Sequence, residues 1–335
     1  MKIIPTVTPL LADTFARNIT YLRMSLTDRC NLRCLYCRPQ AEAGLGSGEL
    51  LSNEELLRVA RVAVGLGIAK IRLTGGEPLI RPDILPFIRD LARIPGLEDL
   101  RLTTNGVRLA ELGPELRRAG IAKLNISLDT LRPDRFREIT GADLFPQVWA
   151  GIEKAKALGF APIKINTVAL RGINDDEFPA LAQLSLDQPY HLRFIEFMPI
   201  GPKSGWAAER YIPSAEIMAR LAHMGELTPV ASGKMDGPAR VYRFAGAQGS
   251  VGFISPLSHQ FCDRCNRLRL TSEGRLRACL LRDQESDLKA IVRGGGSDEA
   301  IRATILQAIF SKPKGHGLGE EGPGNCHGHM SRIGG

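Results

Sequence analysis

Three cysteines near the N-terminus are spaced so that they could hold an iron–sulfur cluster. Cys30, Cys34 and Cys37 follow the pattern C-x-x-x-C-x-x-C. Three thiolates on one short loop can each bind a corner of a cubane cluster, which leaves the fourth iron open to another molecule. A closed structural zinc site needs a fourth Cys or His, and this loop offers none. The spacing therefore favours a four-iron cluster with an open iron over a zinc knuckle that takes a distant ligand.

A second group of cysteines lies near the C-terminus. Cys262 and Cys265 are followed by Cys279 after thirteen intervening residues. A zinc ribbon would require a second C-x-x-C, which is absent, although Cys326 or the histidines near the end of the chain could supply a fourth ligand. The group predicts a second cluster with an open iron, and a zinc site is the alternative.

Arginines beside the second group indicate an anionic ligand. Arg267 and Arg269 are two residues apart in a segment that reads as a strand, so both side chains should point to the same side. Guanidinium groups bind phosphates through two parallel hydrogen bonds, and several of them suit a triphosphate. Because the chain has no P-loop pattern, a nucleotide would have to be held by side-chain charges.

The elements that must position these residues alternate along the chain. Six short apolar or alternating runs read as strands, and each is followed by an amphipathic stretch that reads as a helix, such as Asn53–Leu66, Pro114–Arg118 or Asp175–Leu186. The expected strands are Tyr21–Leu26, Lys70–Leu73, Asp99–Thr103, Lys123–Leu128, Pro162–Ala169 and Leu192–Phe197. Six such units predict a parallel sheet with right-handed crossovers, either an incomplete (β/α)6 barrel of the TIM type or a flat doubly wound sheet. The first cysteine group then begins where the first strand ends, which is where barrel active sites lie.

The alternation ends near Thr228, so we expect residues 1–228 to form the barrel and residues 229–335 a smaller C-terminal cap. Within the cap, Tyr242–Phe244 and Val251–Ile254 read as strands and Asp298–Phe310 as a helix. The stretch from Lys312 onward is rich in Gly, Pro and His and is expected to lack fixed structure.

The composition is that of a globular protein with a basic excess. Hydrophobic residues make up 44%, charged residues 24%, and the net charge is +8. The excess fits a solvated basic surface, a nucleic acid or a small triphosphate. Aromatic residues are only 6% and form no RNA-binding motif, so we expect no nucleic-acid partner. The cysteine content and the absence of a long apolar stretch bear on the location of the protein. Seven cysteines are too few for a disulfide scaffold, and no apolar stretch is long enough to span a bilayer. Both observations predict a soluble cytoplasmic protein without a membrane partner.

The first cysteine group and one glycine-rich segment resemble the signature of the radical S-adenosylmethionine (SAM) superfamily. Tyr36 stands before the third cysteine, and Thr74-Gly75-Gly76-Glu77-Pro78 follows the second expected strand. The resemblance implies that SAM binds the open iron through its amino and carboxylate groups and that the glycine-rich segment contacts its methionine part. An electron from the reduced cluster would then cleave SAM to methionine and a 5′-deoxyadenosyl radical.

The two cysteine groups together, Asn266-Arg267-Leu268-Arg269 and the terminal Gly334-Gly335 resemble the GTP 3′,8-cyclase family (molybdenum cofactor biosynthesis protein A), from about Asp13 to the end of the chain. The resemblance implies two four-iron (4Fe-4S) clusters, the second of which binds the purine of GTP. It implies that SAM contacts Tyr36, Gly76, Ser127 and Met198, and that GTP contacts Arg23, Lys70, Arg72, Thr103, Lys164, Arg193, Arg267 and Arg269. Arg267 and Arg269 are also the candidate catalytic residues.

The implied reaction is a radical cyclisation of GTP. The deoxyadenosyl radical takes hydrogen from C3′ of the ribose, and the resulting carbon radical attacks C8 of guanine. Reduction and protonation then give (8S)-3′,8-cyclo-7,8-dihydro-GTP, in the first step of molybdenum cofactor biosynthesis. The resemblance further implies a reductant such as flavodoxin or ferredoxin, a homodimer, and transfer of the product to cyclic pyranopterin monophosphate synthase.

Two other functions fit part of the sequence. A peptide-modifying radical SAM enzyme with two clusters would usually carry more cysteines in its C-terminal region. A zinc-stabilised nucleic-acid-binding protein would explain the basic charge, but not the glycine-rich segment or the six strand–helix units.

Overall fold

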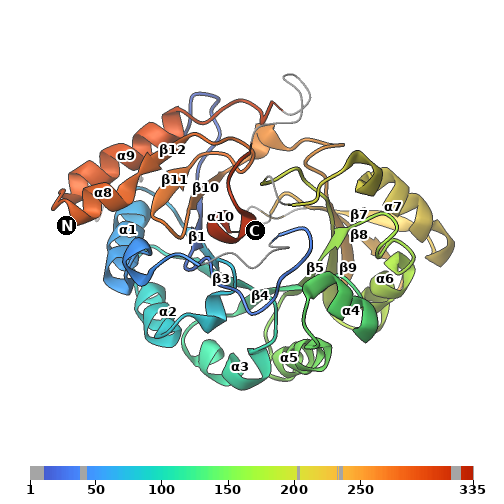
Figure 1. Cartoon of the computed structure of the whole chain (residues 1–335). Coiled ribbons are helices and arrows are strands. Elements are labelled where there is room, and N and C mark those ends of the chain that lie inside the picture. The colour runs from blue at the N-terminus through green and yellow to red at the C-terminus, as the bar shows by residue number, and fades with distance from the viewer. Residues whose placement is uncertain are drawn as a thin grey trace, which may run out of the picture.

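The fold is organised around a curved sheet whose strands line the inside of an incomplete barrel (Figure 1). The computed structural model describes residues 11–37, 44–201, 204–231, 233, 237–317 and 326–334. Within these residues the sheet has twelve strands in the order β12-β11-β10-β1-β2-β3-β4-β5-β6-β9-β8-β7, and its two ends do not pair with each other. The six parallel strands predicted from the sequence are β1 (Tyr21–Ser25), β2 (Lys70–Thr74), β3 (Asp99–Thr104), β4 (Lys123–Ser127), β5 (Ile163–Ala169) and β6 (Tyr190–Glu196).

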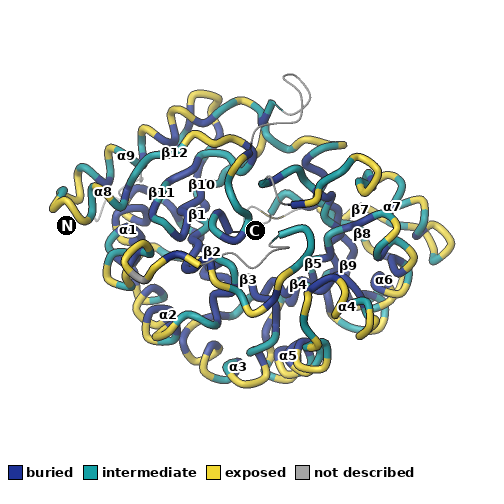
Figure 2. Tube along the Cα trace, in the orientation of Figure 1, coloured by how far each residue is buried: buried dark blue, intermediate teal, exposed yellow. Residues whose placement is uncertain are grey.

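Helices follow these strands and cover the outside of the barrel, with their outer faces exposed (Figure 2). They are α1 (Asn53–Gly65), α2 (Ile84–Ala92), α3 (Leu109–Arg118), α4 (Pro133–Thr140), α5 (Phe145–Ala157) and α6 (Phe178–Asp187). The Ser52 hydroxyl accepts a hydrogen bond from the Glu55 amide at 3.2 Å, and the Glu55 carboxylate accepts one from the Ser52 amide at 2.7 Å, so α1 begins with a capping box. The apolar core lies between the helices and the outward faces of the strands, where Ile71 and Ile165 are fully buried. The inward faces are therefore free to carry polar residues.

The strands of the predicted cap join the same sheet. β9 (Ser250–Ile254) pairs in parallel with β6, and β10 (Arg267–Leu270) pairs in parallel with β1. The antiparallel strands β8 (Arg240–Phe244) and β7 (Leu227–Val230) continue beyond β9, and β11 (Arg275–Arg277) and β12 (Glu285–Asp287) continue beyond β10. The C-terminal region thus extends the barrel wall at both ends. The boundary at residue 228 stays a prediction.

Three further helices and a short C-terminal helix complete the described chain. α7 (Ser214–Leu221) follows β6, and α8 (Leu288–Arg293) leads into α9 (Asp298–Phe310), which packs against α1. α10 (Met330–Ile333) lies in the middle of the barrel. Residues 312–317 and 326–334 of the tail are placed against the barrel, through hydrogen bonds such as that of Lys312 to the Arg267 carbonyl, so a lack of fixed structure of the tail on its own stays a prediction. Among the described residues, no helix combines the length and the apolar character needed to cross a membrane.

Candidate active site

A cavity of about 310 Å³ occupies the barrel interior and brings most of the predicted residues together. Its lining includes all six cysteines of the two groups, which we call the first triplet (Cys30, Cys34, Cys37) and the second triplet (Cys262, Cys265, Cys279). Of the other predicted residues, it includes Tyr36, Gly76, Ser127, Met198, Arg23, Arg72, Thr103, Arg193, Arg267 and Arg269. Lys70 and Lys164 are the two predicted contacts that do not line it.

Lys70 and Lys164 lie behind the cavity lining. Each precedes a lining residue, Arg72 or Asn166, by two positions on its strand and therefore points to the same side of the sheet. Lys70 is 2% exposed, and its Nζ lies 4.4 Å from the ring centroid of Tyr21. Burial, reinforced by repulsion from Arg101 and Arg72, lowers the pKa of Lys70 to about 7. An anion in the cavity would favour the charged form of this lysine.

The first triplet follows β1 and packs against the glycine-rich segment that follows β2. The Gly76 amide donates to the Thr27 carbonyl at 2.6 Å, and the Glu77 amide donates to the Arg29 carbonyl at 2.8 Å. A Cβ atom on Gly76 would lie 2.3 Å from the Arg29 carbonyl oxygen, so a larger residue would push the two segments apart. The glycine is thus required for the position of the cysteine loop itself.

Glu77, within the glycine-rich segment, and Asn105, which was not predicted as a site residue, connect this segment to the first triplet. The Glu77 carboxylate accepts hydrogen bonds from the Thr104 hydroxyl at 2.8 Å and the Asn105 amide at 2.6 Å. The Asn105 side chain in turn donates to Asn31 Oδ1 at 2.8 Å, beside Cys30. Burial raises the pKa of Glu77 to about 7, against the effect of these donors. The position of Asn105 directly after the third strand was the available sequence signal.

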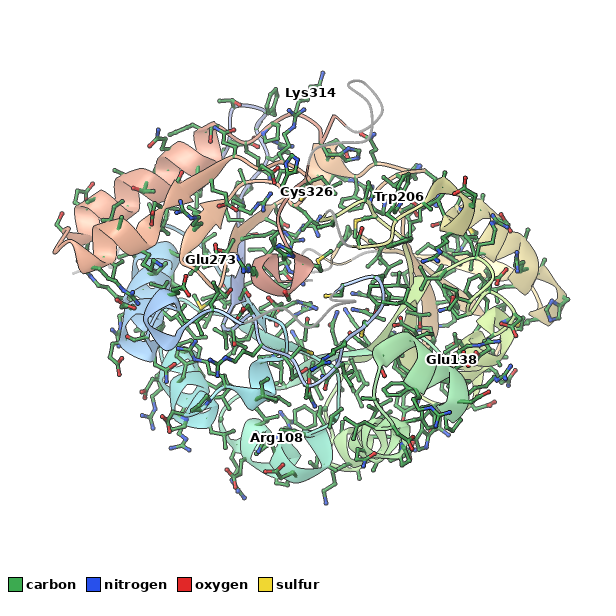
Figure 3. All side chains as sticks on the ribbon, viewed as in Figure 1. Arg108, Glu138, Trp206, Glu273, Lys314 and Cys326 are labelled. Atoms are coloured by element: carbon green, nitrogen blue, oxygen red, sulfur yellow. The ribbon has the colours of Figure 1, made fainter. Side chains whose placement is uncertain are left out.

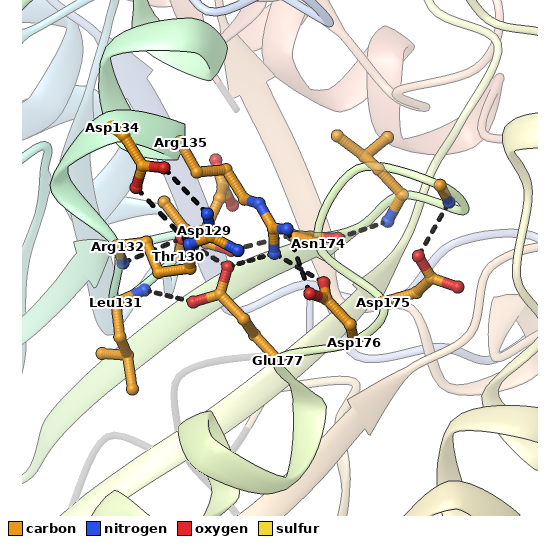
Figure 4. Close-up of polar contacts among 12 residues, drawn as sticks. Asp129, Thr130, Leu131, Arg132, Asp134, Arg135, Asn174, Asp175, Asp176 and Glu177 are labelled. Atoms are coloured by element: carbon orange, nitrogen blue, oxygen red, sulfur yellow. Dashed lines mark hydrogen bonds and ion pairs between the residues drawn. The ribbon is translucent and has the colours of Figure 1, made fainter.

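Tyr36 is held from the side of β4. Its hydroxyl donates to Asp129 Oδ2 at 2.6 Å, and the second carboxylate oxygen accepts from the Val168 amide at 2.8 Å. Burial raises the pKa of Asp129 to about 6 although both donors favour the carboxylate. Figure 4 shows the polar network around Asp129, in which Glu177 accepts hydrogen bonds from the Thr130 hydroxyl at 2.6 Å and from the backbone amide that follows it at 2.8 Å. The loop after β4 is therefore fixed on both sides of Asp129.

The second triplet surrounds the start of β10 and the end of β11. Cys262 begins a short 3-10 turn, Cys265 precedes Arg267 by two residues, and Cys279 follows β11. Burial raises the pKa of the Cys265 thiol, but the nearby charges of Arg267 and Lys312 outweigh it and bring the value down to about 6. Cys265 is thus readily ionised, as a ligand to iron must be.

Arginines on neighbouring strands form a positively charged surface between the two triplets. Arg269 lies beside Arg23 in the register of the sheet, and Arg23 lies beside Arg72. Burial and repulsion from Arg72 lower the pKa of Arg23 to about 10, only partly opposed by Tyr21. Arg72 Nε and Asn166 Oδ1 are buried without a hydrogen-bond partner among the described residues. The buried positive charge and these polar atoms fit a polyphosphate with a polar organic part.

The described part of the C-terminal tail reaches this cavity, where Met330 is one of the lining residues. Arg269 Nη1 donates to the Gly334 carbonyl at 2.6 Å, and a Cβ atom on Gly334 would lie 2.1 Å from the Thr74 hydroxyl.

Cys326 lies near the middle of the molecule, whereas Arg108 and Glu138 lie at the outer helices α3 and α4 (Figure 3). The buried Cys326 thiol donates to the Leu280 carbonyl at 3.3 Å. Gly335, the other half of the predicted terminal pair, lies outside the described residues.

The two triplets present the same kind of donor set. Each consists of three thiols that line the cavity, and three thiolates are what a 4Fe-4S cluster with one open iron requires. In the part of the chain that the structure describes, no three Cys, His, Asp or Glu side chains are grouped closely enough to hold a single metal ion.

Two family models match consecutive parts of the chain. Residues 24–185 match the model of the radical SAM superfamily, and residues 190–318 match that of Molybdenum Cofactor Synthesis C. In structure, the chain resembles SuiB of Streptococcus suis bound to S-adenosylmethionine, with a TM-score of 0.60 and 13% identity over 89% of this chain and 67% of that one. This likeness confirms the incomplete barrel fold.

Two relatives match over nearly their whole length. The GTP 3′,8-cyclase of Pelotomaculum thermopropionicum is 48% identical over 327 residues, which cover 97% of this chain and 100% of the relative. The GTP 3′,8-cyclase of Moorella thermoacetica is 47% identical over 326 residues, with coverage of 97% and 100%. Identity at this level over full-length chains shows the family, and this chain belongs to the GTP 3′,8-cyclases of the radical SAM superfamily.

Proposed function

We propose that this chain catalyses the radical cyclisation of GTP to (8S)-3′,8-cyclo-7,8-dihydro-GTP, the first step of molybdenum cofactor biosynthesis. The observation that carries the proposal is the single cavity lined by both cysteine triplets and by buried arginines. One end of that cavity suits a cluster that binds SAM, and the other suits a cluster that binds the base of a nucleotide triphosphate. The nearly full-length identity to GTP 3′,8-cyclases supports the same reaction.

On the SAM side, Cys30, Cys34 and Cys37 hold a 4Fe-4S cluster, which with SAM supplies the radical that starts the reaction. The chain positions SAM beside the cluster through residues at the carboxyl ends of its strands. We assign Tyr36, Gly76, Ser127 and Met198 to this contact. Gly76 allows close backbone approach, and Tyr36 is kept in place by Asp129.

On the GTP side, we assign Cys262, Cys265 and Cys279 to a second 4Fe-4S cluster whose open iron orients the purine. Arg23, Arg72, Thr103, Arg193, Arg267 and Arg269 contact GTP, while Lys70 and Lys164 add positive charge behind them. A desolvated cluster of guanidinium groups favours a triphosphate strongly because their mutual repulsion is relieved when it binds. Arg267 and Arg269 lie between the second triplet and the arginines of β1 and β2, and are the candidate catalytic residues.

The proposed reaction also needs partners. A reductant such as flavodoxin or ferredoxin supplies electrons, and cyclic pyranopterin monophosphate synthase takes the product. A homodimer and a cytoplasmic location stay predictions.

The test is 5′-deoxyadenosine formation by the anaerobically reconstituted protein with SAM, dithionite and either GTP, ATP or no nucleotide. We expect about eight iron atoms per chain and a rate that rises with GTP only, with the cyclised product identified by mass spectrometry. Cys262→Ser should lose about four iron atoms, whereas the matched control Cys326→Ser should keep all of them. An iron-replete protein whose rate is the same with and without GTP would exclude GTP cyclisation.

A further inference from the structure

Two buried basic side chains from opposite ends of the chain lie behind the second triplet. Lys312 follows α9 and is 3% exposed, and Arg17 precedes β1 and is 7% exposed. Neither lines the cavity, so neither is placed to contact GTP there. Lys314, two residues further on, is exposed at the edge of the molecule (Figure 3).

The Lys312 ammonium joins the two segments that carry Cys265 and Cys279. Its Nζ donates to the Arg267 carbonyl at 2.9 Å and to the Ala278 carbonyl at 2.5 Å. Arg267 follows Cys265 by two residues, and Ala278 directly precedes Cys279. The ammonium also lies close enough to both thiols for their charges to interact.

Arg17 fixes the lysine segment against the remaining cysteine. Its guanidinium donates to the Cys262 carbonyl at 2.7 Å and to the Pro313 carbonyl at 2.7 Å, and its Nε lies 2.5 Å from Asp13 Oδ2. Pro313 is the neighbour of Lys312 in the chain. All three cysteine-bearing segments are therefore connected through these two cations.

We infer that Lys312 is a positioning residue of the second cluster: it holds the segments of Cys265 and Cys279 at a fixed separation and places a positive charge beside the cluster. The inference rests on the proposed second cluster. A cluster ligated by thiolates gains negative charge on reduction, and a buried cation nearby stabilises the reduced form more than the oxidised form. Lys312 therefore raises the reduction potential of the second cluster, and so tunes its readiness to accept an electron.

The charge and the position of Lys312 can be separated by substitution. Lys312→Gln keeps a hydrogen-bond donor but removes the charge, and Lys312→Arg keeps the charge. Lys314→Gln is the matched control, because it removes an exposed lysine from the same segment. Each is made in a chain whose first triplet is replaced by Ala, so that the remaining cluster is the second one. The measurements are iron per chain and the midpoint potential from a redox titration followed by electron paramagnetic resonance.

We expect the parent to hold about four iron atoms. We expect Lys312→Gln to keep them at a more negative potential, and Lys312→Arg and Lys314→Gln to match the parent. Loss of iron in Lys312→Gln with retention in Lys312→Arg also supports the inference.

A Lys312→Gln chain with the iron content and midpoint potential of the parent overturns the inference but does not contradict the second cluster. A parent without iron removes the second cluster itself, and the inference with it. If Lys312→Gln does not fold, Lys312→Arg is the variant that tests the inference. Because it keeps the charge, a midpoint potential different from that of the parent would contradict a role for the charge.

Discussion

Asp129 fixes the position of Tyr36 on the side of the cavity where we propose that SAM binds. Its two carboxylate oxygens accept from the Tyr36 hydroxyl and the Val168 amide. The residue lines the cavity but makes its described contacts with the protein, which makes it a positioning residue for Tyr36.

The first prediction follows from this pair of hydrogen bonds. Asp129→Ala leaves the Tyr36 hydroxyl and a backbone amide without acceptors, at a cost of about 1–3 kcal/mol for each buried group. We expect the KM for SAM to rise roughly tenfold with iron content unchanged, which corresponds to about 1.4 kcal/mol of lost binding. Tyr36→Phe removes one of the two bonds and should give a smaller rise. An unchanged KM in Asp129→Ala would show that Tyr36 does not depend on this contact.

The second prediction concerns the pH dependence of GTP binding. The pKa of Lys70 is lowered to about 7 in the free protein, so the lysine is largely neutral above that pH. A bound triphosphate raises the pKa of Lys70 again, and binding then takes up a proton. We expect GTP affinity to fall between about pH 7 and about pH 9, by up to about tenfold per unit. Titration calorimetry in buffers of different ionisation enthalpy should show the uptake, and Lys70→Met should abolish it.

Residue types with local spacing could be predicted from the residues themselves, whereas isolated residues such as Ser127 and Arg193 were predicted only through the family resemblance. The two triplets and Arg267 with Arg269 form patterns within a few positions, and the cavity contains them. Asn105, Asp129 and Lys312 have no such pattern. Their roles depend on partners far away in the sequence, such as Tyr36 for Asp129, and only the folded structure brings these partners into contact.

At the scale of elements, one buried carboxylate connects three segments around the second triplet. Glu196 ends β6 and accepts hydrogen bonds from the Ser214 amide that begins α7 and from the Leu257 and Ser258 amides, each at 3.0 Å. The loop that contains Leu257 and Ser258 leads from β9 to Cys262.

The third prediction is that Glu196→Ala destabilises the fold by roughly 3 kcal/mol, because several buried donors lose a charged acceptor at once. Thermal unfolding of the apoprotein measures the loss. Glu209→Ala, at an exposed position shortly before α7, is the control and should leave the melting temperature nearly unchanged. A Glu196→Ala melting curve like that of the control would show that these hydrogen bonds add little.

A fourth prediction concerns the tail that enters the cavity. Asp283 accepts from the His327 amide at 2.9 Å and contacts Arg277 Nη2 at 3.0 Å, while Arg332 pairs with Glu273 at 2.7 Å. We expect Asp283→Ala to speed hydrogen exchange of residues 326–334 while β10 and β11 stay protected. Unchanged exchange in the tail would show that the Arg332 pair and α10 suffice.

The positions of the strands and helices could be predicted well from the sequence, whereas the starts of two helices and the pairing of β10 with β1 could not. The helix expected at Pro114–Arg118 begins at Leu109 and carries Pro114 in its interior, a position that local reasoning disfavours because proline lacks the amide for the backbone hydrogen bond. The helix expected from Asp175 begins at Phe178, because the Asp175 side chain instead accepts from the Gly172 amide in a turn. The pairing of β10 with β1 joins residues far apart in the chain, and local periodicity carries no information about it.

At the scale of the whole molecule, the barrel interior concentrates positive charge. Arg23, Arg72 and Arg269 lie on adjacent strands, and Asp99 deeper in the barrel is already paired with Arg101 at 2.5 Å and Lys123 at 3.1 Å. Part of the positive charge behind the net value of +8 therefore lies inside the barrel, where it can bind an anion, and part lies on the surface.

A fifth prediction follows for the protein without its clusters. Inorganic triphosphate should raise the melting temperature, by about 2 °C for each kcal/mol of binding energy, because it relieves the repulsion between buried arginines. Sodium chloride at the same ionic strength should not reproduce the rise. The double variant Arg23→Met with Arg269→Met should lose most of it, and an equal rise in that variant would place the anion elsewhere.

The order of strands in the sheet has a consequence for how the protein is made. The neighbours of β1 and β6 on their outer sides are β10 and β9, which come from the last third of the chain. During synthesis on the ribosome, both edges of the six-stranded half-barrel therefore stay unpaired until those strands emerge, and unpaired edges invite association with other chains. The nascent chain therefore needs its two sheet edges shielded in the interval between synthesis of the six strands and arrival of β9 and β10.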